Sequence, residues 1–305
     1  MDFHIKNFSL KKFYKNKIFW RIRNFLLRIK IRVDYFNNIK NENSKIKISI
    51  LREFFAPPYG GGNQFMLYLL KSLRKKGYKV KINSFKKDIN LFIADYCWFP
   101  RRYEKLLENH KKKYNSKLIH RLDGILSQYR NDGKNMDEFA ISINKMANAT
   151  IIQSNYTANQ FSEKGFDIKN IKIINNSPDE MIFNKTHNKI FDKKNIKIIS
   201  ASWSTNKKKG MDDYKWLDDN LKLEVNYSFI GRLDFIPKSI KLIEPLNQKA
   251  LANKLKDSDI FLFAAINESC PNILIEAIAC GLPIIYKNSG GSKELVKEFG
   301  LPYNE

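Results

Sequence analysis

The sequence has few of the residues that build metal centres or disulfide frameworks. Its 305 residues include three cysteines and four histidines. Cys97, Cys270 and Cys280 form no CxxC pair, and the histidines are widely spaced. We therefore expect no zinc site. We also expect reduced thiols in an intracellular chain, because an odd, small number of cysteines does not suit a disulfide framework.

Long apolar segments are also missing. A membrane-spanning helix needs a run of about 18 apolar residues, and the sequence has no such uncharged run. The N-terminus shows charge among its apolar residues and no small-residue cleavage site after them, so it does not read as a signal peptide. These absences predict a cytoplasmic chain, and peripheral attachment to the inner face of the membrane stays open as an alternative.

Acidic residues are too few to balance the basic ones. The chain has 31 Asp and Glu against 55 Lys and Arg, a formal net charge of +24. Such a field favours anionic partners, namely nucleic acid, phospholipid surfaces or phosphorylated small molecules. The sequence is also rich in Lys, Asn and Ile, so an AT-rich genome would produce the same bias without any functional meaning. No recognised nucleic-acid-binding motif is present, which makes a nucleic-acid partner the weaker hypothesis.

Much of this charge lies in a basic N-terminal segment, residues 1–46. It holds twelve Lys or Arg against three acidic residues, with aromatic and aliphatic residues between them. We predict a basic helix over about 10–33, which could lie on an anionic membrane surface. The alternative is a helix that packs on the first domain and exposes a basic face. The apolar residues do not sort onto a single stripe, so the pattern does not choose between the two.

From residue 47 onward, strand and helix patterns alternate. Buried-strand patterns occur at 47–53, 78–85, 89–96, 117–124, 149–156, 170–176, 195–203, 225–231, 259–265 and 282–288. Helical patterns fall at about 64–76, 103–113, 136–147, 157–164, 211–220, 248–256, 272–280 and 292–299. This alternation predicts an α/β fold with two doubly wound, Rossmann-like domains, 47–180 and 181–305. The polar segment 177–195 is the expected linker.

The most informative segment is 257–296, DSDIFLFAAINESCPNILIEAIACGLPIIYKNSGGSKELV. A buried strand ends near Ala265, a loop carries Glu268, and the following helix carries Glu276 in its early turns. A second glycine loop, Gly290-Gly291, opens the last helix. Ligands of open α/β sheets bind outside the carboxyl ends of the strands, where both loops lie. Helix N-terminal amides suit a phosphate, and a carboxylate suits sugar hydroxyls as a paired acceptor.

At these residues the chain resembles family 4 glycosyltransferases of GT-B fold (glycosyl transferases group 1). The shared pattern is Glu268, seven residues, then Glu276-Ala277-Ile278-Ala279-Cys280-Gly281-Leu282-Pro283, followed by Gly290-Gly291 and Glu294-Leu295-Val296. The resemblance covers about 48–300 and is strongest over 257–296. It implies an N-terminal acceptor domain and a C-terminal nucleotide-sugar donor domain. Chains of this fold usually end with further helices, so we expect the C-terminal domain to be short or truncated.

The resemblance implies roles for individual residues. Glu268 would hold the hydroxyls of the donor sugar, and Glu276 would bind the nucleotide ribose. The family also uses an Arg and a Lys for the diphosphate. Lys209, before Gly210, matches the Lys, but Ser202 or Trp203 stands near the Arg position. The other residues expected at the donor are Asn206, Ser269, Cys270, Pro271 and Asn272.

Further candidates lie in the first domain. Gly60, Gly61, Gly62 and Asn63 match the family's glycine-rich first loop, where Asn63 or a neighbour would cap the helix that follows. The glycines form neither the spaced dinucleotide fingerprint nor a P-loop.

At the exit of the strand that ends near residue 124, Asp123 or His120 could orient the acceptor hydroxyl or act as a base. A strand-exit carboxylate and a structural histidine are the open alternatives. Ser154 and Asn155, at the next strand exit, are weaker candidates.

We therefore predict an enzyme that moves a sugar, by resemblance a hexose with retention of configuration, from a nucleotide sugar to a hydroxyl acceptor. The acceptor would be a surface polysaccharide or lipid-linked glycan. No metal is expected, since the family that the chain resembles needs none. A catalytically inert nucleotide-sugar-binding protein is the main alternative, prompted by the departure at the Arg position. A basic nucleic-acid-binding protein is the other.

Overall fold

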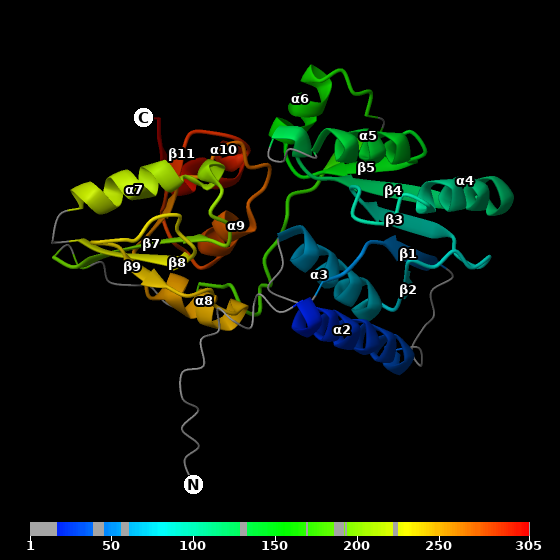
Figure 1. Cartoon of the computed structure of the whole chain (residues 1–305), viewed down its shortest axis with the longest axis horizontal. Helices are drawn as coiled ribbons and strands as arrows, with labels where there is room; N and C mark the ends of the chain where they lie inside the picture. Colours follow the sequence, from blue (N-terminus) through cyan, green and yellow to red (C-terminus); the bar gives the residue numbers. More distant parts are fainter. Residues whose placement is uncertain are drawn as a thin grey trace, which may run out of the picture. The chain divides into compact units, whose positions relative to one another are not determined.

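The computed structural model describes residues 17–38, 46–55, 61–128, 133–168, 170–185, 192, 194–221 and 225–304. Contacts between Cα atoms divide the chain into two units, Met1–Ile119 and His120–Glu305. This boundary falls inside strand β4, whereas we predicted a boundary at 180/181, and that boundary stays a prediction. The elements are labelled in Figure 1.

The first sheet has six strands in the order β2-β1-β3-β4-β5-β6. Their bounds are β1 Lys47–Leu51, β2 Lys79–Ile82, β3 Leu91–Asp95, β4 Lys117–Leu122, β5 Ala149–Ile152 and β6 Ile171–Ile173. Strand β1 pairs in parallel with both β2 and β3, and β5 pairs in parallel with β6. The predicted doubly wound arrangement of this half is therefore confirmed.

The helices of this half follow the predicted order. They are α2 Lys17–Asn38, α3 Gly61–Lys75, α4 Tyr103–Tyr114, α5 Gly133–Asn144 and α6 Asn155–Glu163, with a 3-10 turn η2 at Leu126–Gln128. Gly77 has a φ of 84°, and Tyr78 N donates to the carbonyl of Leu73, so Gly77 ends α3 in the left-handed conformation that glycine favours.

The glycine-rich segment differs from its prediction. Gly61 and Gly62 are the first residues of α3 rather than part of a loop, and Gly60 lies outside the described residues. Asn63 does not cap the helix. It is 3% exposed, its Oδ1 accepts from Phe55 N and its Nδ2 donates to Phe55 O. Asn63 therefore ties the start of α3 to the chain that leaves β1.

The second sheet also has six strands, in the order β12-β11-β10-β7-β8-β9. They are β7 Ile196–Ser202, β8 Val225–Gly231, β9 Lys241–Ile243, β10 Ile260–Phe263, β11 Ile284–Lys287 and β12 Gly300–Tyr303. Each neighbouring pair is parallel. Renumbered along the chain, this is the 3-2-1-4-5-6 order of dinucleotide-binding sheets. Strands β9 and β12 were not predicted, because both are short edge strands and β12 contains a proline.

Two layers of helices enclose this sheet. Its helices are α7 Met211–Asn220, α8 Gln248–Lys256, α9 Asn272–Ala279 and α10 Ser292–Val296, with 3-10 turns η3 Lys207–Lys209 and η4 Lys297–Phe299. The predicted last helix is shorter than expected, since Lys297 has a φ of 48° and interrupts it. Figure 1 shows α7 and α8 on opposite faces of the sheet.

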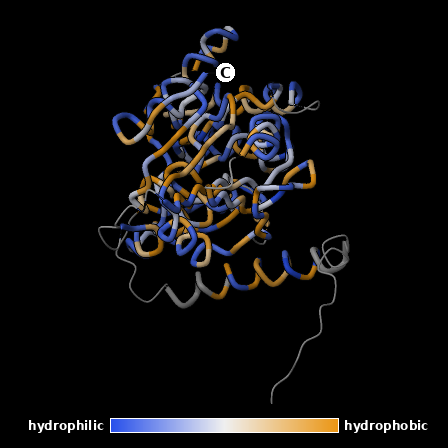
Figure 2. Tube along the Cα trace, turned by 90° about the vertical axis from the view of Figure 1, so that its left-hand side faces the viewer, coloured by the Kyte–Doolittle hydropathy of each residue, from blue (hydrophilic) through white to orange (hydrophobic). Residues whose placement is uncertain are grey.

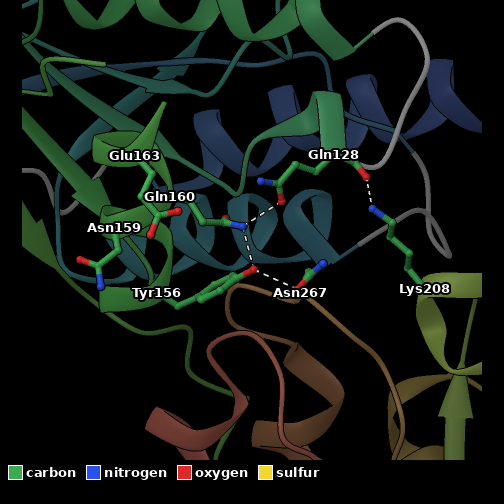
Figure 3. Close-up of a pocket in the computed structure, with 7 residues that line it drawn as sticks. All are labelled: Gln128, Tyr156, Asn159, Gln160, Glu163, Lys208 and Asn267. Atoms are coloured by element: carbon green, nitrogen blue, oxygen red, sulfur yellow. Dashed lines mark hydrogen bonds between the residues drawn. The ribbon is translucent and has the colours of Figure 1, made fainter. Parts of the chain in front are cut away.

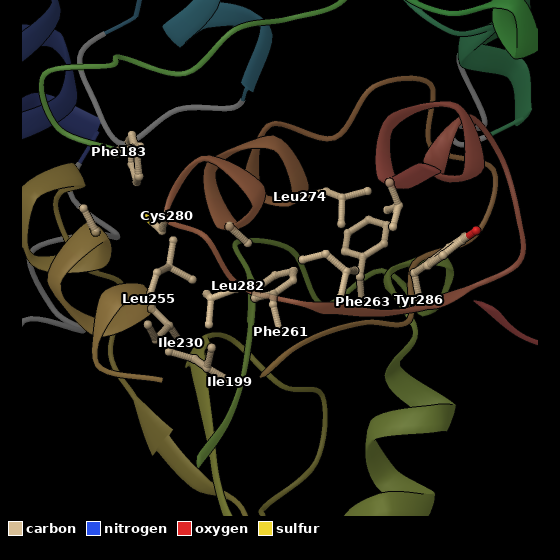
Figure 4. Packing of buried hydrophobic residues seen from close by; sticks show 14 of the residues in the cluster. Phe183, Ile199, Ile230, Leu255, Phe261, Phe263, Leu274, Cys280, Leu282 and Tyr286 are labelled. Carbon is tan, nitrogen blue, oxygen red and sulfur yellow. The ribbon is translucent and has the colours of Figure 1, made fainter. Parts of the chain in front are cut away.

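The core on the α8 and α9 face is shown in Figure 4, where Phe261 and Phe263 of β10 pack with Leu255 and Leu274. Phe183, from the predicted linker, is 1% exposed and belongs to the same cluster. The described residues of 177–195 form turns at 180–182 and at Lys194, and no helix or strand. One aromatic anchor therefore fixes this segment to the second sheet.

All three cysteines are free and buried. In the part of the chain that the structure describes, no helix combines the length and the apolar character needed to cross a bilayer.

Candidate functional site

The candidate site lies at the carboxyl ends of β7 and β10, where the strand order of the second sheet reverses. The loops that follow these strands pack directly on each other. Ile266 N donates to the carbonyl of Lys208 at 2.8 Å. Gly210 has a φ of 84°, and a Cβ there would lie 2.4 Å from Ala264 Cβ, so only glycine permits this approach.

Two predicted donor residues meet at this point. The ammonium group of Lys209 is hydrogen-bonded and ion-paired to Glu268 Oε1. Their side chains are 34% and 20% exposed, so both are partly accessible. Asn206 organises the turn below them, because its Oδ1 accepts from Lys208 N at 3.0 Å. Asn206 therefore helps to place Lys209, and its contact with the donor stays a prediction.

The second glycine loop supports Glu268 from behind. Gly291 N donates to the carbonyl of Glu268 at 2.8 Å. Gly290 has a φ of 67°, and a Cβ there would lie 2.5 Å from the same carbonyl oxygen. The Gly-Gly pair thus allows a close backbone contact that fixes the loop carrying Glu268.

The residues between Glu268 and α9 are held by Asn176. Asn176 Nδ2 donates to the carbonyl of Cys270 at 3.0 Å and to Asn272 Oδ1 at 2.8 Å, while its backbone N–H donates to Cys270 Sγ at 3.2 Å. Burial raises the pKa of the Cys270 thiol to about 11, so it stays neutral at physiological pH. Pro271 precedes the first residue of α9.

Ser269 belongs to the same loop and is also tightly packed. A Cβ on Gly124 would lie 2.6 Å from Ser269 Oγ, so Gly124 leaves room for that hydroxyl. Packing and hydrogen bonds therefore fix the segment that leads into α9. It contains the four residues predicted to lie at the donor, Ser269, Cys270, Pro271 and Asn272.

Glu276 lies in the second turn of α9 and is partly buried. Burial raises the pKa of its carboxyl to about 7. Among the described residues, none is hydrogen-bonded to this carboxylate. A partly buried carboxyl that has no partner in the protein is a candidate ligand-binding group.

Asp123 and His120 differ in accessibility. The Asp123 side chain is 25% exposed, and its Oδ1 accepts from Gln153 Nε2 and pairs with Arg121 Nη1, both at 2.7 Å. His120 is fully buried in β4, and its Nδ1 lies 3.3 Å from Asn144 Nδ2. In this structure His120 does not reach solvent, so we do not carry its predicted catalytic role further.

A polar cavity of about 390 Å³ opens next to Lys208 and Asn267, the chain neighbours of Lys209 and Glu268. Figure 3 shows how its side chains are linked: Gln160 Nε2 donates to Gln128 Oε1 and to the hydroxyl of Tyr156, which donates to Asn267 Oδ1. The remaining lining residues are Asn159 and Glu163.

Sequence reasoning reached only the edge of this cavity. Ser154, one of its weaker candidates, caps α6: its Oγ accepts from Thr157 N. Four of the cavity residues follow Ser154 on α6, namely Tyr156, Asn159, Gln160 and Glu163.

The family resemblance implies an arginine near Ser202 or Trp203, and neither of these residues is one. A guanidinium nevertheless lies there, because Arg232, which follows β8, stacks on the Trp203 ring with Cζ 4.4 Å from its centroid. Sequence reasoning missed Arg232, since it lies 29 positions along the chain from Trp203.

Residues 186–301 match the family model of glycosyl transferases group 1. The match contains Lys209, Glu268 and Glu276 and spans the second sheet from β7 to β11. The second half of the chain therefore carries a glycosyl transferases group 1 domain. No curated protein matches the chain.

Solved structures show the same two-sheet GT-B fold. The Anabaena protein HepE, solved in complex with UDP and glucose, has a TM-score of 0.63 at 15% identity, covering 85% of this chain and 86% of that one. Sucrose-phosphate synthase from Thermosynechococcus elongatus has a TM-score of 0.66 at 12% identity, with the same coverage. WaaG, a glycosyltransferase involved in lipopolysaccharide biosynthesis, has a TM-score of 0.57 at 13% identity, again covering 85% and 86%. The predicted fold class is confirmed.

Proposed function

We propose that this protein transfers a sugar, a hexose with retention of configuration, from a nucleotide-sugar donor to a hydroxyl acceptor. The observation that carries the proposal is the contact between Lys209 and Glu268 at the strand-order reversal of a dinucleotide-type sheet. Both residues lie inside the segment that matches glycosyl transferases group 1. HepE, which has the same fold, is solved with UDP-glucose, and this supports a nucleotide sugar as donor.

The donor would lie along the carboxyl edge of the second sheet. Lys209 would bind the diphosphate and stabilise its negative charge as the glycosidic bond breaks. Glu268 would accept hydrogen bonds from hydroxyls of the sugar, and Glu276 from hydroxyls of the ribose. We propose that no metal ion is required, because the cationic side chain of Lys209 supplies positive charge where the diphosphate would lie.

The polar cavity suits the acceptor. Its lining offers amide, hydroxyl, carboxylate and ammonium groups from Gln128, Gln160, Tyr156, Glu163 and Lys208. Such a set can both donate to and accept from the hydroxyls of a glycan. Of Asp123 and His120, the two residues predicted to contact the acceptor, only Asp123 is accessible. We propose that its carboxylate orients the acceptor hydroxyl. A surface polysaccharide or lipid-linked glycan is the acceptor class we propose.

A panel of nucleotide sugars tests the function. Binding and slow hydrolysis of UDP-, GDP-, ADP- and dTDP-sugars should reveal one preferred donor, with hydrolysis unchanged by EDTA. Replacing Glu268 by alanine should weaken the binding of that donor at least about tenfold, because a charged acceptor of hydrogen bonds from the sugar hydroxyls is lost. Calorimetry and detection of the released sugar give the two readouts.

The matched control is Glu298→Ala, which removes an exposed carboxylate of η4, the turn before strand β12 of the second sheet. It should bind and hydrolyse the donor as the native chain does. Donor binding without hydrolysis or transfer to any glycan acceptor would favour the inert binding protein instead. If no nucleotide sugar binds while DNA binds with a steep salt dependence, the nucleic-acid alternative replaces the proposal.

We also propose that the protein works on an anionic membrane surface and that α2 is the contact. Leu27 and Ile31 of α2 pack into the core against α3, and Arg74 Nη1 of α3 donates to the carbonyl of Ile31 at 2.9 Å. The apolar residues therefore sort onto two faces rather than one. Among the α2 residues whose side chains are described, the exposed apolar ones are Ile22, Phe25, Leu26, Ile29 and Val33, each between 42% and 62% exposed. Figure 2 shows apolar and polar stretches interleaved along this helix.

Basic residues accompany that exposed stripe. Arg21, Arg23, Arg28 and Lys30 lie on the same helix, which contains no acidic residue before Asp34. Apolar side chains with Arg and Lys beside them suit the headgroup region of an anionic bilayer. Residues 10–16, the first part of the predicted membrane helix, lie outside the described residues.

Replacing both Phe25 and Ile29 by serine should reduce binding to vesicles that contain phosphatidylglycerol at least about fivefold, because two apolar contacts with the lipid are lost. Co-sedimentation with phosphatidylglycerol and pure phosphatidylcholine vesicles measures the effect. The native chain should prefer the anionic vesicles, and added salt should weaken binding. Leu106→Ser, at an α4 position that is 43% exposed, is the control. Equal vesicle binding by the native chain and the double variant would contradict the proposal.

A further inference from the structure

The stacked pair of Arg232 and Trp203 stands out on the second sheet. The guanidinium Cζ of Arg232 lies 4.4 Å from the centroid of the Trp203 ring. A guanidinium at that distance is attracted by the face of an indole, which restricts its position without using its N–H groups. Those N–H groups point outward in the guanidinium plane and stay available to an anion.

The backbone places this pair with little freedom. Ser202 of β7 and Gly231 of β8 are partners in the parallel register, so Trp203 and Arg232 leave the sheet side by side. Arg232 N donates to the carbonyl of Ser202 at 3.0 Å. Gly231 has a φ of 121°, and a Cβ there would lie 1.9 Å from the same carbonyl oxygen, so glycine is required. The close crossing directs Arg232 over the tryptophan.

Arg232 differs from the arginines that hold the fold together. Arg121 is ion-paired with Asp123, and Arg74 donates to the backbone carbonyls of Ile31 and Val80. Arg232 is exposed, and within the described residues its guanidinium has no ion pair or hydrogen bond. A positioned but unpaired guanidinium is what an anionic ligand would need.

Its place along the sheet shows which ligand this would be. The strands run β8, β7, β10 along the carboxyl edge, so the loop with Trp203 and Lys209 lies between Arg232 and Glu268. Lys209, on the loop after β7, and Arg232, on the loop after β8, therefore place two cations on neighbouring loops. Two cations at adjacent loops suit a diphosphate, whose charge is spread over several oxygens, better than a single carboxylate.

We propose that Arg232, held by Trp203, binds the diphosphate of the nucleotide donor together with Lys209. This assignment rests on the proposed function and deepens it. In this chain the guanidinium comes from the end of β8 instead of the end of β7, where Trp203 stands and serves as the stacking surface. Arg232 is thus a donor-binding residue, and Trp203 is a positioning residue that acts through it.

Isothermal titration calorimetry with UDP, GDP and ADP, with the matching nucleosides and with pyrophosphate tests the assignment. Arg232→Ala should lower the affinity for the preferred nucleoside diphosphate and for pyrophosphate about tenfold or more. The affinity for the uncharged nucleoside should stay unchanged. Arg232→Lys should recover only part of the loss, since an ammonium cannot make the bidentate contact. Lys241→Ala removes an exposed cation at the other end of the neighbouring strand β9 and should behave as the native chain.

Variants of Trp203 separate positioning from charge. Trp203→Leu should weaken diphosphate binding severalfold while Arg232 is still present, and Trp203→Phe should keep most of it because a ring remains. In the Arg232→Ala background, Trp203→Leu should add little, because the two residues act as one unit. Thermal unfolding of each variant shows whether the fold is retained.

The outcomes separate this assignment from the proposed function. Native diphosphate affinity in Arg232→Ala, alongside a loss in Lys209→Ala, overturns the assignment and leaves the proposed function standing. An equal loss for nucleoside and diphosphate also overturns it, because Arg232 would then contact the nucleoside. If the native chain binds none of the nucleotides or nucleotide sugars, the proposed function fails and the assignment fails with it.

Discussion

Replacing Lys209 by alanine should lower the turnover number of sugar transfer by about 10²–10³-fold, the cost of removing one group that stabilises developing negative charge. Negative charge grows on the diphosphate as its bond to the sugar breaks. Lys209 is held by η3 and by Glu268 before any ligand arrives, so its ammonium group need not reorganise during the reaction. Initial rates with the donor chosen by the panel, over a range of donor concentrations, measure the effect.

The neighbouring lysines provide the controls. Lys207 is an exposed cation of the same 3-10 turn, so Lys207→Ala removes an equal charge and should change the turnover number less than about twofold. Lys208 is a less suitable control, because its ammonium group donates to the carbonyl of Gln128 at the cavity. Lys209→Arg should keep part of the activity, because the positive charge remains.

The way in which the constants change decides the interpretation. A higher KM with an unchanged turnover number would mean that Lys209 binds the donor equally well before and during the reaction, and the proposed catalytic role would be wrong. Removing Lys209 also leaves the Glu268 carboxylate without its cation. A double-mutant cycle with Glu268→Ala therefore separates the direct effect from that secondary one.

The regular elements of this chain could be predicted because their patterns are local. Helices α7 and α8 and strand β8 have the predicted bounds, since each combines a clear period with polar or glycine residues at its ends. The first turn of α3 was missed because glycine favours a loop by propensity, whereas here the tie between Asn63 and Phe55 fixes the helix start.

The site could be predicted where its residues lie close together in the sequence. Glu268, Glu276 and Gly290-Gly291 belong to one strand-loop-helix run, so a motif was enough to find them. The contact between Lys209 and Glu268 joins positions 59 residues apart, and only the adjacency of β7 and β10 brings them together. For the same reason Arg232 could not be found from the sequence, since its partner Trp203 follows the neighbouring strand β7.

His120 is a candidate whose burial the sequence did not predict. Its type and its strand-exit position fit a general base, but side chains alternate in direction along a strand. The His120 ring faces the α5 side, where Asn144 contacts it, while Asp123, beyond the end of the strand, remains accessible. A pattern that identifies the strand could not show where β4 ends relative to these two residues.

Replacing Glu276 by glutamine should weaken nucleotide binding and at the same time stabilise the unliganded protein at alkaline pH. Burial raises the pKa of the Glu276 carboxyl to about 7, from an ordinary value of 4.5. The native chain must therefore hold a charge in a poorly solvated place above pH 7, which costs stability. The glutamine variant has no such charge and nearly the same shape.

The sign follows from proton linkage. The folded state holds this proton more tightly than the unfolded state does, so the native protein loses stability as the pH rises from about 4.5 to about 7. The melting temperature of Glu276→Gln should match that of the native chain near pH 4.5 and exceed it at pH 8. Scanning calorimetry at both pH values measures the difference. The exposed control Glu298→Gln should show no comparable gain at pH 8.

Nucleotide binding should respond in the opposite direction. At pH 8 the ionised carboxylate can accept from both ribose hydroxyls, so Glu276→Gln should bind the nucleoside about tenfold or more weakly. Native affinity for the nucleoside should also fall between pH 8 and pH 6, as the carboxyl takes up its proton, and the variant should lose this pH dependence. A nucleoside carries no phosphate, so protonation of a ligand phosphate cannot cause this pH dependence of the affinity. A variant that gains stability at pH 8 but binds the nucleoside with native affinity would show that the buried carboxyl does not contact the ribose.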